Sequence, residues 1–255
     1  MNHTAHASGM PNVTEDGLLG GRLRLLQPER GYRAGMDAAL LAAACDSGPG
    51  ARVLEAGCGV GGALLQAAFR RPDSAFTGLE RDPAALALAR ENVARNGLSA
   101  RVEIREGDVG QPFSRLGLAT FDLVMANPPF FDDPETLRAP APERRAAWMA
   151  EGGLAAWIRF MGKAVRQGGA LLVIHRADRL ADLLAQMGQA CGSVQIRPVH
   201  PFADAPAKRV LVRAVKSGRA PLQLLPPLVL HPRGEARHTD AAAAVLAGEA
   251  ALPWA

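Results

Sequence analysis

A glycine-rich turn near residue 60 is the first feature of this sequence that could do chemistry. The residues Glu55-Ala56-Gly57-Cys58-Gly59-Val60-Gly61-Gly62 join a run typical of a strand to a run typical of a helix. Glycines at such a junction let the backbone turn tightly and let a ligand approach it closely. Gly57, Gly59 and Gly62 also satisfy the G-x-G-x-x-G dinucleotide pattern. The turn therefore predicts a nucleotide-like ligand, and on spacing alone it leaves a nicotinamide cofactor open.

Three acids lie at the ends of three successive predicted strands. Glu55 stands two residues before the first glycine, Glu80 ends the second strand, and Asp108 follows the third. A carboxylate at Glu55 would repel a pyrophosphate and attract a cationic or amino-bearing group. S-adenosylmethionine offers an α-amino group and a sulfonium without any phosphate, and its ribose diol and adenine amine could donate hydrogen bonds to Glu80 and Asp108. The acids favour this cofactor over a dinucleotide.

The segment Asn127-Pro128-Pro129-Phe130 follows the most apolar predicted strand and supplies the candidate catalytic residues. An exocyclic amine is a poor nucleophile because its lone pair is delocalised into the ring. The side-chain oxygen of Asn127 and the carbonyl of Pro128 could each accept one N–H and free that lone pair. Both prolines would hold the acceptors in place, while Phe130 would stack on an extruded base. Positioning and electrostatics would carry the transfer, with no metal.

Alternating strand-like and helical runs from residue 52 onward indicate an α/β fold with a mostly parallel sheet. Seven strands are expected, at about residues 52–56, 75–80, 101–105, 121–126, 170–174, 194–199 and 209–215. Asp82-Pro83 predicts a capped helix start and Asn96-Gly97 its end. Carboxyl ends of parallel strands share one edge of a sheet, so the turn, the acids and Asn127 are expected to meet there.

Four segments divide the chain. Residues 1–16 are predicted to be a flexible tail, 17–50 a hairpin and helix flank, 51–215 the Rossmann-like core, and 216–255 a C-terminal extension, with residues 17–255 forming one domain.

Composition excludes several classes of protein. The chain has 255 residues, 48% apolar and 21% charged, with a formal net charge of +4, as expected for a chain that buries a sizeable core. Its apolar stretches fall far short of the roughly 20 residues that a membrane span needs. Three cysteines without a C-x-x-C pair argue against a disulfide framework or a zinc site. The N-terminus does not resemble a signal peptide, so we expect a cytoplasmic protein without membrane or metal partners.

Taken together, these motifs resemble the class I S-adenosylmethionine-dependent methyltransferases that carry an N-P-P-[FY] loop. E-x-G-x-G-x-G, the acid of the second strand, G-D-V and N-P-P-F carry the resemblance, which covers residues 52–215. It implies a doubly wound, Rossmann-like sheet of seven strands, and S-adenosyl-L-homocysteine as product. The expected cofactor residues are Glu55, Gly57, Gly59, Gly61, Glu80, Arg81, Asp108, Val109 and Asn127.

Within that class, residues 27–41, 127–131 and 228–246 are similar to the bacterial valine-tRNA adenine-N6 methyltransferases. The sequence departs from that family at Phe130-Phe131, where relatives often have two tyrosines, and at His238-Thr239, where they have Tyr-Thr. The aromatic surface is kept, and the phenol hydroxyls are absent. The resemblance implies methyl transfer to N6 of an adenine in RNA, with tRNA as the expected substrate.

Contacts with RNA are expected from residues near the catalytic loop and the far strands. Residues 198–239 hold seven Lys or Arg and two acids, which is compatible equally with a nucleic-acid face and with a solvated edge. The candidate substrate residues are Phe130, Phe131, Arg144, Arg145, Lys208 and Arg209.

Three alternatives remain open at this point. Asn-Pro-Pro-Phe would serve a glutamine side-chain amide equally well, so a protein-glutamine N5-methyltransferase is the nearest rival, although about 50 residues before the first core strand leave little room for its usual helical substrate domain. An NAD(P)-dependent oxidoreductase is disfavoured by Glu55 and by the Asn-Pro-Pro loop. A catalytically silent RNA-binding module is disfavoured by the intact loop. The oligomeric state is not predicted.

Overall fold

The computed structural model describes residues 13–29, 33–129, 152–188 and 191–254. Phe130, Phe131, Arg144 and Arg145, which the sequence analysis assigns to catalysis or substrate binding, lie outside these ranges. No helix in the described part of the chain is long and apolar enough to cross a membrane. Nor do three or more His, Cys, Asp or Glu side chains gather there in a way that could hold a metal ion.

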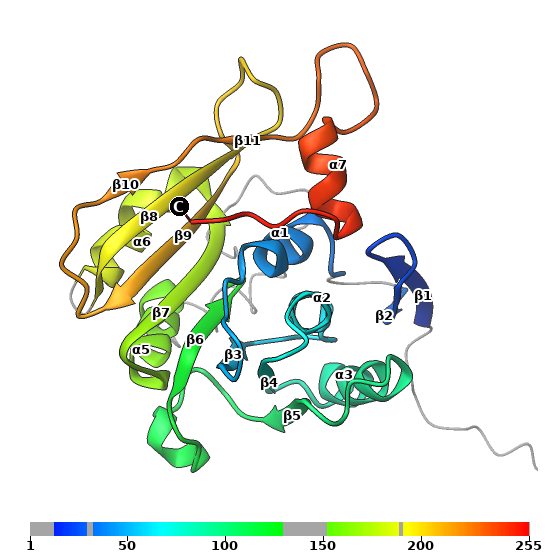
Figure 1. Cartoon of the computed structure of the whole chain (residues 1–255). Helices are drawn as coiled ribbons and strands as arrows, with labels where there is room; N and C mark the ends of the chain where they lie inside the picture. The colour runs from blue at the N-terminus through cyan, green and yellow to red at the C-terminus, as the bar shows by residue number, and fades with distance from the viewer. Residues whose placement is uncertain (1–12, 30–32, 130–151, 189–190, 255) are drawn as a thin grey trace, which may run out of the picture.

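A twisted, mostly parallel sheet forms the centre of the molecule (Figure 1). Its strand order is β10-β8-β9-β7-β6-β3-β4-β5, with β11 beside β8. The seven predicted strands are all present, and the two-residue strands β10 (Gln223–Leu224) and β11 (Leu228–Val229) enlarge the sheet. The seven are β3 (Arg52–Ala56), β4 (Ala75–Glu80), β5 (Val102–Glu106), β6 (Phe121–Ala126), β7 (Val165–Arg176), β8 (Cys191–His200) and β9 (Arg209–Lys216). Only β9 runs antiparallel to its long neighbours β7 and β8.

Helices cover both faces of the sheet, as the doubly wound fold requires. Figure 1 shows α1 (Met36–Ala44), α2 (Gly62–Arg70) and α3 (Pro83–Arg95) on one side and α5 (Gly153–Ala164) and α6 (Leu180–Met187) on the other. Neighbouring residues of a strand face opposite ways, so Val53 joins the core beneath α1, α2 and α3 while Leu54 joins the core beneath α5 and α6. Short 3-10 turns lie at Phe113–Leu116 and Ala177–Arg179.

The predicted start of the α3 helix is confirmed. Asp82 accepts a hydrogen bond from the Ala85 N–H at 2.8 Å and is followed by Pro83 in the first turn. The Asp82 carboxylate thereby binds one of the N–H groups at the helix start that have no partner within the helix. Pro83 costs no hydrogen bond, because a residue in the first turn needs no N–H for the helix.

An antiparallel hairpin of β1 (Val13–Leu18) and β2 (Leu23–Pro28) precedes the core. Residues 13–16 therefore lie in a strand, and the prediction that they belong to a flexible tail is wrong. The reason is that β1 is held by polar partners and not by an apolar face. Asp16 accepts from Gln27 Nε2 at 2.7 Å, and Thr14 accepts from Arg33 at 2.7 Å.

The C-terminal extension packs back onto the first helix. After α7 (Asp240–Ala247), the Leu252 N–H donates to the Ala43 carbonyl at 2.9 Å and Trp254 Nε1 donates to the Ala44 carbonyl at 2.7 Å. These carbonyls belong to the last turn of α1, which has no intrahelical donors for them. The extension thereby closes the end of α1 that leads into β3.

Candidate active site

The carboxyl ends of β3, β4, β5 and β6 meet at one edge of the sheet, as predicted. Ala56 pairs in register with Leu79 of β4 and with Ala126 of β6, and Glu80 pairs with Glu106 of β5. Because β4 and β5 continue the sheet on one side of β3 and β6 on the other, the strand order reverses at β3. Such a reversal opens the crevice in which α/β sheets bind their ligands.

The glycine turn after β3 adopts conformations that favour glycine. Gly57, Gly59 and Gly61 have φ values of +66°, +54° and +90°. A Cβ on Gly57 would lie 2.3 Å from the Trp157 ring, so this glycine is required by packing against α5. A Cβ on Gly59 would meet no atom of the described residues within 4 Å. The backbone at Gly59 is thus open on the side from which a ligand can approach.

Glu80 fastens this turn to the end of β4. Its Oε2 accepts from the Gly59 N–H at 2.8 Å, and its Oε1 accepts from the N–H groups of Arg81 and Asp82, each at 2.8 Å. Three backbone donors hold the carboxylate in one orientation. A carboxylate oxygen has more than one lone pair, so Glu80 keeps capacity to accept from a ribose hydroxyl.

Glu55 is a buried carboxylate beneath the first turn of α2. Glu55 is 3% exposed, and the Leu64 N–H of α2 donates to its carboxylate. Its Oε2 has no hydrogen-bond partner among the described residues. Burial raises the pKa of Glu55 well above its usual range, the Leu64 N–H opposes this shift, and the charge of Glu80 adds to it. A cationic group beside Glu55 would relieve this cost.

Asp108 completes the row of acids on the β5 side. Its Oδ1 accepts from the Gly110 N–H at 2.8 Å, and its Oδ2 lies 3.5 Å from Arg81 Nη1. Arg81 therefore bridges the ends of β4 and β5. Val109 packs against the core beneath α5. The structure places both predicted neighbours, Arg81 and Val109, at the edge where the acids gather.

Asn127 directly follows β6, next to the position of Gly57 across the β3–β6 ladder. Its side chain is half-buried, Pro128 is buried and Pro129 is half-buried. A strand that ends in two prolines cannot continue its ladder. The segment thus leaves the sheet at the crevice and presents Asn127 beside the glycine turn.

The predicted cations Lys208 and Arg209 lie where β9 begins, on the same edge of the sheet, since Arg209 pairs with Arg176 at the end of β7. Arg209 Nε donates to Asp37 of α1 at 2.9 Å, which gives this side chain a structural partner. Arg213 forms an ion pair with Asp46 at 3.0 Å. The structure therefore accounts for part of the basic excess by pairing within the fold, while Lys208 is exposed.

Two residues that support the turn belong to none of the sequence motifs, namely Trp157, which packs on Gly57, and Asn92 of α3. Asn92 is completely buried, and its Nδ2 donates to the Val60 carbonyl at 3.0 Å. The sequence could have indicated the burial of Asn92 in one way. Asn92 lies four positions after Leu88, which is the spacing of residues on the buried face of α3.

Comparison with known proteins shows similarity to methyltransferases. A family model described as a methyltransferase domain matches residues 47–212. The tRNA1(Val) (adenine(37)-N6)-methyltransferase of Porphyromonas gingivalis is 35% identical over 158 residues, which cover 59% of this chain. The match spans 61% of the length of that relative. Release factor glutamine methyltransferase of Geobacter sulfurreducens is 39% identical over 95 residues, or 37% of this chain and 31% of that one.

A solved structure gives the same fold. The crystal structure of a predicted O-methyltransferase, protein Atu636 from Agrobacterium tumefaciens, matches with a TM-score of 0.72 at 28% identity. The match covers 85% of this chain and 98% of the other.

The site has the chemistry that S-adenosylmethionine needs. Glu55 offers a buried, uncompensated carboxylate oxygen for a cation, and Gly59 offers open backbone. The family match extends across the core strands that carry both features. The chain therefore belongs to the methyltransferase domain family.

Proposed function

We propose that this methyltransferase acts on the exocyclic N6 amine of an adenine in RNA, and that its substrate is a tRNA. The observation that carries the proposal is the position of Asn127, which follows β6 beside the glycine turn and is succeeded by two prolines. The tRNA1(Val) relative, named for adenine-N6 methylation, supports the choice of substrate.

The cofactor would be held by the row of acids. Glu55 is suited to the α-amino group, Glu80 to the ribose hydroxyls and Asp108 to the adenine amine, while Gly57, Gly59 and Gly61 let the ligand approach the backbone. When bound, S-adenosylmethionine supplies a methyl group on a positively charged sulfur. Arg81 fixes the position of Asp108, and Val109 supplies an apolar contact beside it.

Asn127 and Pro128 would prepare the amine for attack. The Asn127 side-chain oxygen and the Pro128 carbonyl each accept one N–H of the target amine, which draws its lone pair out of conjugation with the ring. The amine held in this way would accept the methyl group that the cofactor supplies, and it would lose one proton to solvent. The prolines keep both acceptors fixed, so the geometry costs no reorganisation during the reaction.

An asparagine suits a nitrogen nucleophile better than an oxygen nucleophile. A hydroxyl group must lose its proton to a base before or during methyl transfer. An amide side chain accepts a hydrogen bond but does not take up a proton at neutral pH. Asn127 in the central position of the site therefore favours N-methylation over O-methylation.

A glutamine side-chain amide is the second candidate substrate. It is also a planar, delocalised NH₂ group, and Asn127 and Pro128 could accept from it in the same way. The relative named release factor glutamine methyltransferase supports this alternative over 95 aligned residues.

Recognition of RNA would depend on aromatic and basic side chains. Phe130 and Phe131 would supply stacking surfaces, and Arg144, Arg145 and exposed Lys208 would contact phosphates. Arg209 is proposed only as a secondary contact because Asp37 already binds its guanidinium.

A labelling experiment separates the two substrates. Purified protein is incubated with methyl-labelled S-adenosylmethionine and either total tRNA lacking this modification or a bacterial protein extract, with and without nuclease. We expect N6-methyladenosine in digested tRNA and loss of the label after nuclease treatment. Label that resists nuclease and is recovered as N5-methylglutamine would contradict the RNA proposal and support the second candidate.

Replacing Asn127 tests the catalytic assignment. Asn127→Ala removes one of two acceptors for the amine and should lower kcat by about 100-fold or more, the usual cost of losing a preorganised polar contact in a transition state. Binding of S-adenosylhomocysteine, measured by calorimetry, should fall far less than kcat, because Glu55, Glu80 and Asp108 would still hold the cofactor. Turnover within a factor of three of the wild type would refute the mechanism.

Replacing Glu55 tests the cofactor assignment through two opposite effects. Glu55→Gln removes the charge that would bind the amino group, so cofactor affinity should fall by about 10- to 100-fold, the value of one charge-assisted hydrogen bond. The same change removes a buried charge, so the ligand-free variant should be more stable than the wild type at pH 8 by about 1–2 kcal/mol.

The pH dependence follows from the raised pKa of Glu55. The folded chain holds this proton more tightly than the unfolded chain, so the free energy of unfolding falls as the pH rises from the ordinary carboxyl range through the raised value. Denaturant titrations should show the stability gain of Glu55→Gln at pH 8 and little gain at pH 4. A variant that is less stable than the wild type at both pH values would contradict the assignment.

A further inference from the structure

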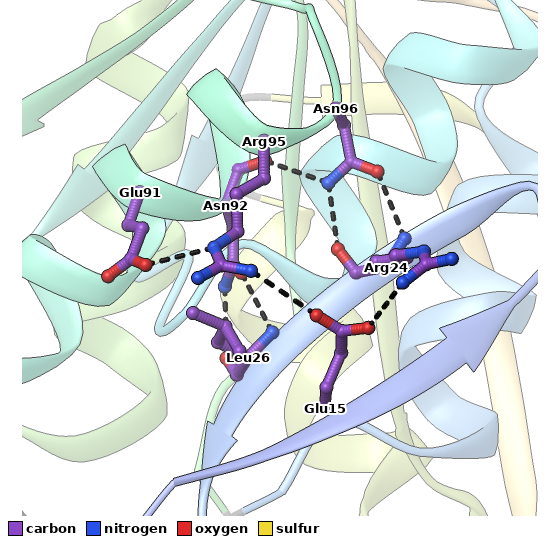
Figure 2. A network of polar contacts seen from close by, with 7 residues as sticks. All are labelled: Glu15, Arg24, Leu26, Glu91, Asn92, Arg95 and Asn96. Atoms are coloured by element: carbon purple, nitrogen blue, oxygen red, sulfur yellow. Dashed lines mark hydrogen bonds and ion pairs between the residues drawn. The ribbon is translucent and has the colours of Figure 1, made fainter.

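The outer edge of the N-terminal hairpin is covered by helix α3 instead of another strand. Strand β2 pairs with β1 along one edge, and the N–H and C=O groups of Arg24 and Leu26 point to the other. A free strand edge exposes unpaired backbone groups. Figure 2 shows two asparagine side chains, Asn92 of α3 and Asn96 at the C-cap of that helix, meeting this edge.

Each asparagine side chain forms hydrogen bonds with both the backbone N–H and the backbone C=O of one β2 residue. Asn96 Oδ1 accepts from the Arg24 N–H at 2.9 Å, and Asn96 Nδ2 donates to the Arg24 carbonyl at 2.7 Å. Asn92 Oδ1 accepts from the Leu26 N–H at 2.8 Å, and Asn92 Nδ2 donates to the Leu26 carbonyl at 2.9 Å. Residues four apart share a helix face, and residues two apart share a strand edge, so the two amides fit the register of β2.

The two amides differ in where their remaining N–H goes. Asn96 donates it to the Asn92 carbonyl within α3, at 2.8 Å. Asn92 donates it to the Val60 carbonyl in the glycine turn, at 3.0 Å. Asn92 is completely buried, so a lost bond there leaves a carbonyl without solvent to replace it.

The glycine turn is therefore held from three directions. Glu80 fixes the Gly59 N–H, Trp157 packs on Gly57, and Asn92 fixes the Val60 carbonyl. Of these three supports, only the Asn92 amide also hydrogen-bonds to the hairpin. The ion pairs around the same edge, Arg24–Glu15 and Arg95–Glu15, are exposed and contribute little.

We propose that Asn92 is a positioning residue for cofactor binding. Its amide sets the Val60 carbonyl against the edge of β2, so that the adjoining Gly59 backbone keeps the orientation in which a ligand can approach it. The hairpin thereby becomes part of the cofactor site without contacting the cofactor. This inference rests on the proposed placement of the cofactor at the glycine turn.

Asn96 supplies a matched control. Asn92→Ala and Asn96→Ala each remove an amide that pairs with β2, but only the first removes the bond to the turn. Dissociation constants for S-adenosylhomocysteine are measured by calorimetry, melting temperatures by circular dichroism, and exchange of backbone amides in residues 57–62 by mass spectrometry, all on the full chain.

We expect Asn92→Ala to weaken S-adenosylhomocysteine binding by about 10-fold, to raise KM for S-adenosylmethionine with kcat within twofold, and to speed amide exchange in the turn. Asn96→Ala should bind within twofold of the wild type. If both variants lose melting temperature and neither loses affinity, Asn92 is structural only and the proposal is wrong.

Two further outcomes also decide the proposal: a variant that does not fold and a wild type that does not bind the ligand. If Asn92→Ala does not fold, Asn92→Ser replaces it, because serine keeps a small polar group. Its affinity for S-adenosylhomocysteine should also fall, but by a smaller factor. Unchanged affinity in a folded Asn92→Ser chain would overturn the proposal. If the wild type itself does not bind S-adenosylhomocysteine, the proposed cofactor site fails and this inference fails with it.

Discussion

A carboxylate buried without a counter-charge is the constraint on which the site depends. Glu55 lies under the first turn of α2, accepts from the Leu64 N–H and leaves Oε2 without a partner in the described part of the chain. The α2 N-terminus offsets only part of the cost of burying this charge, because its partial positive charge is small. The fold tolerates the remaining cost, which a cationic ligand would remove. Ligand binding and the stability of the core are linked at this one side chain.

The exposed backbone at Gly59 can bind a ligand in one orientation only if the rest of the turn is rigid. Three residues of the turn, Gly57, Gly59 and Gly61, have left-handed conformations, which glycine adopts at an entropic cost. Its supports come from β4, from α5 and from α3, which are widely separated in sequence. Gly62, the last residue of the turn, is constrained by packing instead, since a Cβ there would lie 2.2 Å from the Ala34 Cβ. The segment after the hairpin is thus packed directly on the start of α2.

Much of the fold and of the candidate site could be predicted because local sequence specifies it. Glu55, the glycines, Glu80 and Asn127 occupy fixed places relative to strand ends, so their meeting follows from a parallel sheet alone. Asn92 and Trp157 could not be found in that way, since their roles depend on partners brought together by folding. For the same reason Arg209, expected to contact RNA, is paired with Asp37 of α1. The strand at residues 13–18 lacks an apolar alternation and is specified by polar partners in β2 and at Arg33.

Proton release on cofactor binding tests the role of Glu55 most directly. Calorimetric titrations with S-adenosylmethionine are made at several values between about pH 5 and pH 7, where its amino group stays protonated, each in buffers of different ionisation enthalpy. A cation beside Glu55 lowers its raised pKa, so within this range the wild type should release protons on binding that Glu55→Gln does not release. Equal proton release by both chains at every pH, or none by either, would contradict a cationic ligand at Glu55.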